Sequence, residues 1–171
     1  MTDTIWIRSA VHPETRKAVC LLHWGETGNA LLTPEATLAT ARDLTAAAAA
    51  AEADVALIRS LREDVQADDS VVGGLLKAVR ARRPMPAAAR PALRIHAVAG
   101  AKTGKPLVHI GRGSLKAELD PDEAREMAGH WTEVAVAAQI DARLRYVLGA
   151  HPQLTADDIN GIFEQLQGVQ R

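Results

Sequence analysis

A long apolar helix between Thr33 and about Arg62 is the most regular pattern in the chain. Thr33 can accept hydrogen bonds from the free N–H groups of the first turn, and Pro34 suits a first helical position that needs no N–H. The following turns contain no Gly or Pro and include six consecutive alanines, which have the highest helix propensity. Apolar residues recur at alternating steps of three and four, which is typical of a seam against a second helix. The seam consists of Ala41, Leu44, Ala48, Ala51, Val55 and Ile58.

Shorter patterns flank this helix. Apolar residues at 5–7 and 19–22 predict two strands, and the polar residues between them predict the turn of a hairpin. After the long helix, an apolar side over residues 70–82 predicts a second, shorter helix. Three prolines within residues 84–91 then favour an extended linker.

The same order of patterns recurs after the linker. Residues 93–98 and 107–110 predict a second hairpin, a Pro-containing cap opens a long helix over about residues 120–148, and a short helix follows after residue 156. Several anchors recur at a spacing of about 86–89 residues. The matching pairs are Ile7 and Ile95, His23 and His109, Gly25 and Gly111, Pro34 and Pro121, and Asp69 and Asp158. We interpret this pattern as a tandem duplication of a hairpin–long helix–short helix unit.

This organisation predicts an α+β fold with one unit over residues 1–83 and a second over residues 92–171, together forming one globular body. A two-stranded hairpin is not stable alone. We therefore expect the two hairpins to join into one four-stranded antiparallel sheet, with the helices packed on one face and a pseudo-two-fold relation between the halves. The alternative is that two unrelated units share common helix-capping residues.

Composition adds limits on the class of protein. The chain has 171 residues, of which 47% are hydrophobic and 24% charged, as in ordinary globular proteins. The sequence has no apolar run of membrane-spanning length, and its first residues lack the features of a signal peptide. The single cysteine, Cys20, excludes an internal disulfide and is expected to be a buried apolar residue. We expect a cytoplasmic protein without a membrane partner.

The charge distribution is uneven, although the net charge is only −1. From Ser70 to Ala117 the chain has ten of its twenty Lys and Arg residues and none of its twenty-one Asp and Glu residues. Such a block is typical of a surface that contacts an anionic partner, most often nucleic acid. The other interpretation is that it pairs with the acidic helices of the same fold. The candidate contacts are Lys77, Arg80, Arg82, Arg83, Arg94, Lys102, Lys105 and Arg112.

Catalytic and metal-binding patterns have little support in the sequence. The glycine-rich turn at residues 100–105 has the wrong spacing for a phosphate loop and leads into a strand. His96 and His109 are expected to be cross-strand neighbours, but a metal site needs further ligands. We expect neither a metal ion nor a cofactor. Trp6 and Trp24, near the ends of the first hairpin, are either core anchors or part of a partner surface.

These observations favour a non-catalytic binding or regulatory module that acts through protein–protein interaction. The alternative is a duplex-DNA-binding protein that uses the basic block between Ser70 and Ala117. An enzyme ranks third, because no catalytic group of residues can be assembled from spacing.

Overall fold

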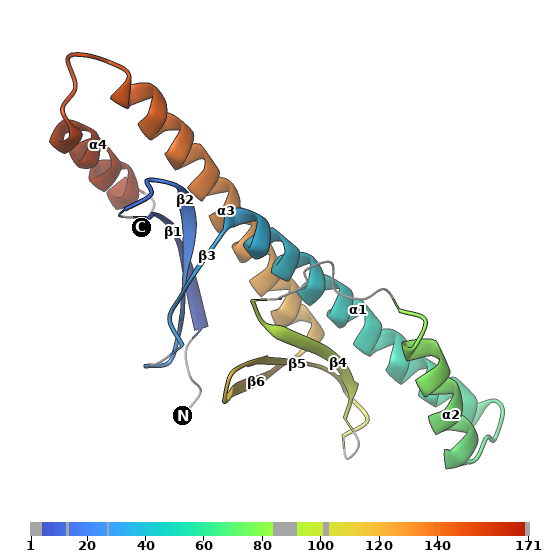
Figure 1. Cartoon of the computed structure of the whole chain (residues 1–171). Helices are drawn as coiled ribbons and strands as arrows, with labels where there is room; N and C mark the ends of the chain where they lie inside the picture. Colours follow the sequence, from blue (N-terminus) through green and yellow to red (C-terminus); the bar gives the residue numbers. More distant parts are fainter. Residues whose placement is uncertain (1–4, 13, 27, 84–91, 101–102, 170–171) are drawn as a thin grey trace.

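The computed structural model describes residues 5–12, 14–26, 28–83, 92–100 and 103–169; the predicted linker, residues 84–91, lies outside them. Three strands and two helices form the first half, and the same order follows in the second half (Figure 1). The first half contains β1 (Ile5–Val11), β2 (Ala18–Trp24), β3 (Ala30–Leu32), α1 (Pro34–Glu63) and α2 (Asp69–Arg80). The second half contains β4 (Arg94–Ala99), β5 (Pro106–Arg112), β6 (Leu115–Leu119), α3 (Pro121–Gly149) and α4 (Ala156–Val169).

Both long helices begin where their capping residues predict. The Thr33 hydroxyl accepts a hydrogen bond from the backbone N–H of Ala36 at 3.1 Å, and α1 starts at Pro34. At α3, the side chain of Asp120 accepts from the first turn, and Glu123 accepts from the backbone of Asp120 in a complete capping box. The predicted boundaries of these helices are therefore confirmed to within about a residue.

The strands form two separate three-stranded antiparallel sheets, with the orders β1-β2-β3 and β4-β5-β6. The α+β class is confirmed, but the predicted single four-stranded sheet is wrong. A third strand was missed in each half, because Ala30–Leu32 is very short and Leu115–Leu119 alternates with charged residues. Gly25 directly follows β2, and Gly113 lies in the two-residue turn between β5 and β6, with φ angles of 57° and 59°. Glycine adopts this left-handed conformation without steric cost.

Each sheet is covered mainly by the long helix of the other half. α1 lies mostly against β4 and β5, whereas α3 lies against β1 and β2, and the two helices pack on one another. Each hairpin gains a third strand and a helix on its apolar face, so each sheet has the support that a two-stranded hairpin lacks without joining the other sheet. One continuous core results, with Trp24 and Leu44 from the first half and Val108 and Trp131 from the second.

The contact between α1 and α3 is built from small side chains. Ala48 and Ala51 on α1 and Ala135 and Ala138 on α3 are all fully buried. Figure 1 shows the helices side by side over their N-terminal halves and running in opposite directions. The members of the predicted seam from Ala41 to Val55 are all buried, while Ile58 is partly exposed. Alanine at these positions allows the two helix backbones to approach closely.

The C-terminal parts of the long helices extend away from this contact, and each carries a short helix (Figure 1). α2 packs on α1, and α4 packs on α3. Val72 on α2, and Ile159 and Phe163 on α4, supply the buried side chains. Within the part of the chain that the structure describes, none of the helices combines the length and apolar character needed to cross a bilayer.

Candidate functional site

Two members of the predicted basic block are used inside the fold. Asp54 on α1 is fully buried, and its carboxylate forms ion pairs with Arg80 at the end of α2 and with Arg83 just beyond it. The Arg80 Nε–Asp54 Oδ2 distance is 2.9 Å, and Arg83 also donates to the carbonyl of Ala50 at 3.3 Å. These arginines therefore hold α2 on α1.

Other members of the block support the second sheet. Arg94 donates to the carbonyl of Gly113 at 2.9 Å, and Arg112 donates to the carbonyl of Ala92 at 3.0 Å. Both bonds join β4, or the residues before it, to the end of β5 and the turn that follows. Arg80 and Arg94 are exposed despite these contacts, Lys77, Arg82 and Lys105 are also exposed, and Lys102 lies outside the described residues. The block is thus divided between internal contacts and exposed side chains.

A polar row crosses the outward face of the second sheet. His96 and His109 are direct cross-strand partners, as the turn predicts, and Glu118 on β6 is the next residue in the row. His109 Nε2 lies 3.0 Å from Glu118 Oε1. Glu118 was missed because β6 was not predicted, although apolar residues at 115, 117 and 119 alternate with polar ones. No group of three potential metal ligands is close enough to hold an ion anywhere in the described ranges.

The outward face of the first sheet is apolar instead. Trp6 on β1 stacks on His23 of β2 with ring centroids 4.7 Å apart, and the guanidinium of Arg8 lies 6.0 Å from the Trp6 ring. Trp6 is 39% exposed, and Leu31 on β3 is 51% exposed. Leu21 pairs with both Arg8 and Leu31, so it lies between them on the same face.

The two tryptophans proposed for a partner surface therefore occupy different environments. Trp24 is fully buried and belongs to the core, while Trp6 is on the solvent side of β1. The strand period of two explains this difference, because Trp6 pairs with His23 and the next residue along β2 points to the opposite face. Of this pair, Trp6 is the one available to a partner.

The strand registers allow the two outward faces to be compared position by position. The inward row of Ile7, Leu22 and Ala30 corresponds to the row of Ile95, Ile110 and Ala117. The residues next to these rows on the outward side differ in chemistry between the halves. The matched pairs, first sheet before second, are Trp6 and Arg94, Leu21 and His109, and Leu31 and Glu118. At these three positions the first sheet has an apolar side chain where the second has a polar one, whereas Arg8 of the first sheet corresponds to polar His96 of the second.

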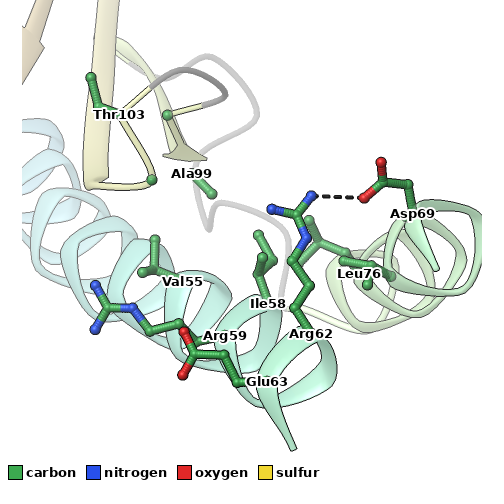
Figure 2. A pocket seen from close by; sticks show the side chains of 13 residues that line it. Val55, Ile58, Arg59, Arg62, Glu63, Asp69, Leu76, Ala99 and Thr103 are labelled. Atoms are coloured by element: carbon green, nitrogen blue, oxygen red, sulfur yellow. Dashed lines mark hydrogen bonds and ion pairs between the residues drawn. The ribbon is translucent and has the colours of Figure 1, made fainter. Parts of the chain in front are cut away.

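A groove lies between α1, α2 and the end of β4 (Figure 2). Its volume is about 570 Å³, and Figure 2 shows Val55, Ile58 and Leu76 pointing into it. At the rim, Arg62 on α1 forms an exposed ion pair with Asp69 on α2 at 2.9 Å. The rim also includes Arg59 and Glu63, so acidic and basic side chains alternate around an apolar floor. This arrangement suits an apolar side chain rather than a charged ligand.

The short helices expose a second set of apolar side chains. Leu75 and Val79 on α2 are 44% and 40% exposed, and Ile162 and Leu166 on α4 are 36% and 46% exposed. Leu75 and Val79 follow buried Val72 by three and seven residues, and Ile162 and Leu166 follow buried Ile159 by the same intervals. The two ends of the molecule therefore display similar apolar stripes.

The shifted titratable groups have local structural causes. Burial raises the pKa of the Cys20 thiol above its ordinary value. Burial also raises the pKa of Asp141, which accepts a hydrogen bond from Ser9 of β1. Hydrogen bonds from the hydroxyl and backbone N–H of Thr155, the residue before α4, lower the pKa of Asp158 in the first turn of that helix. A thiol with a raised pKa is a poor nucleophile at neutral pH, so Cys20 acts as a core residue.

Comparison of the chain with protein-family models, with curated proteins and with solved structures finds no match.

Proposed function

We propose that the protein is a non-catalytic binding module that recognises another protein through the outward face of its first sheet. The observation that carries this proposal is the contrast between the two sheets. At equivalent positions the second sheet has Arg94, His109 and Glu118, as expected for a solvated surface, whereas the first has apolar side chains.

The chemistry of this face suits a protein partner. Tryptophan buries a large area for little loss of conformational freedom, and it is enriched among residues that dominate binding energy. Trp6 is already held in place by His23, so binding would not need to order it. Leu31 and Leu21 extend the apolar surface across the sheet, and Arg8 supplies a charged group beside it. Exposed apolar patches with polar neighbours mark interaction sites.

Duplex DNA remains the alternative partner. It would use the exposed Lys77, Arg82 and Lys105, because Arg80 and Arg83 already pair with Asp54. Binding through phosphates would fall steeply with salt, whereas binding through an apolar sheet face would not.

The experiment that tests the proposal transfers the polar residues of the second sheet to the first. The double variant Trp6→Arg and Leu31→Glu changes two exposed side chains, so the fold is expected to persist. The wild-type protein is used to capture partners from cells of the source, and affinity for the captured protein is then measured. Loss of the tryptophan and leucine is expected to weaken binding by at least tenfold, or about 1.4 kcal/mol.

The matched control is His96→Ala with Glu118→Ala on the second sheet, which is expected to leave binding unchanged. Equal loss in both double variants, or full binding by the first-sheet variant, would contradict the proposal. Retention of duplex DNA that disappears on adding salt, and that survives the first-sheet changes, would favour the alternative.

A further inference from the structure

Helix α3 is apolar on two opposite sides. One side includes Trp131, Ala135 and Ala138, which are buried in the core. The other side presents bulky side chains to solvent at steps of three or four residues, so they form a single stripe. These residues, which we call the α3 stripe, are Val136, Ile140, Leu144 and Val147, with exposed fractions of 44%, 49%, 43% and 64%.

No other part of the described fold covers this stripe. The first sheet reaches α3 through Ser9, which hydrogen-bonds Asp141, and α4 reaches it through Phe163, whose ring lies 4.0 Å from the guanidinium of Arg145. A helix turns about 100° per residue, so Asp141 and Arg145 point well away from Ile140. The packed neighbours therefore lie on the sides of α3 that the stripe does not use.

The first long helix provides an internal comparison. On α1, the outward residues between buried Ala48 and Val55 include Ala49 and Ala53, which are exposed but small. On α3, the outward residues after buried Ala135 are bulky Val136 and Ile140. The fold itself thus does not require large apolar residues on the outside of a long helix, and α3 has them nonetheless.

When two α3 helices pack antiparallel through their stripes, the residues beside each stripe lie opposite residues of complementary charge or size on the other helix. We infer that α3 pairs with α3 of a second copy of the chain, antiparallel, about a two-fold axis on the stripe side of α3 at the level of Ala138 along the helix. Val136 then lies opposite Ile140 of the partner, and exposed Glu133 lies opposite exposed Arg143. Val147 lies opposite Gly129, where nothing within 4 Å would obstruct an added side chain. Two-fold symmetry makes each of these contacts twice.

Charge favours a second copy over an unrelated helix as the occupant. Acidic Glu133 and basic Arg143 lie at equal distances on either side of Ala138 along α3, which is the arrangement that an antiparallel pair needs. The helix dipoles also oppose each other in this orientation. Stable specific interfaces bury roughly 1,200–2,000 Å² in total, whereas this contact consists of a single pair of helices. We expect reversible association that depends on protein concentration.

The test is the molar mass of the full chain by sedimentation equilibrium over a wide concentration range. The expected mass rises from 18.2 kDa toward twice that value. Ile140→Glu places two carboxylates near the axis and is expected to weaken association by at least about tenfold. Val147→Asp, at a still more exposed position, is a second variant if the first folds poorly. Leu75→Glu on α2, where exposure is similar, is the matched control and should associate like wild type.

The charges test the orientation separately. Glu133→Arg and Arg143→Glu should each weaken association, because each opposes like charges twice in the dimer, and the two changes together should restore it. A chain that is monomeric at every concentration overturns the inference. So does association that resists Ile140→Glu, that Leu75→Glu abolishes, or that the paired charge reversal fails to restore. The first-sheet variant with Trp6→Arg should associate normally, which separates this surface from the proposed partner face.

Discussion

Asp54 is a buried carboxylate on α1, and its two arginine partners reach it from α2 and from the residue three positions beyond that helix. It is fully buried, while the side chains of Arg80 and Arg83 are 41% and 27% exposed. A buried charge is tolerated only when it is paired and hydrogen-bonded. The ion pairs at Asp54 therefore fix the angle between α1 and α2 and, with it, one wall of the groove.

Replacing Asp54 with Asn is expected to lower the free energy of unfolding by about 2 kcal/mol, because both arginines lose their ionised partner. The measurement is urea denaturation followed by circular dichroism. Asp69→Asn is the matched control, since Asp69 also pairs with an arginine across the same two helices but is exposed. Its expected cost is below about 1 kcal/mol. Equal effects of the two substitutions would show that burial of Asp54 is not what matters.

At the scale of elements, the close approach of α1 and α3 depends on alanine. Ala48 and Ala51 on α1 are fully buried, as are Ala135 and Ala138 on α3, so small side chains line the buried sides of both helices. The neighbouring outward alanine, Ala49, has the same helix propensity but touches solvent. The run of six alanines thus serves packing at some positions and only helix formation at others.

Ala48→Leu should therefore destabilise the protein by about 1–3 kcal/mol, because the added atoms overpack a contact without free space. Ala49→Leu adds the same side chain one residue later and should change stability by less than about 0.5 kcal/mol. Thermal unfolding of the two variants at equal concentration measures the difference. Similar melting temperatures would contradict the packing described for the α1–α3 contact.

The elements also show which features the sequence could predict. Helix starts at Thr33 and Asp120 depend on neighbouring residues, so local chemistry was sufficient to place them. The pairing of Asp54 with Arg83 joins residues far apart along the chain and left no local signal. The third strands were too short or too polar to recognise. Without them, the outward row that contains Glu118 could not be assembled.

At the scale of the whole molecule, the prediction from sequence was wrong about how the two halves combine. Apolar hairpins and apolar helices predict that a shared core exists, but not which helix covers which sheet. The structure exchanges the long helices, so neither half completes its own core. This arrangement leaves both outward sheet faces open. One is polar, and the other carries Trp6 and Leu31.

The exchange of helices determines which faces are open and is therefore the central claim. Nuclear Overhauser effects between methyl groups of the labelled intact protein test it most directly. We expect the strongest contacts to join methyl groups of α3 to those of β1 and β2, and methyl groups of α1 to those of β4 and β5. A spectrum in which each long helix instead contacts mainly the sheet of its own half would contradict the account.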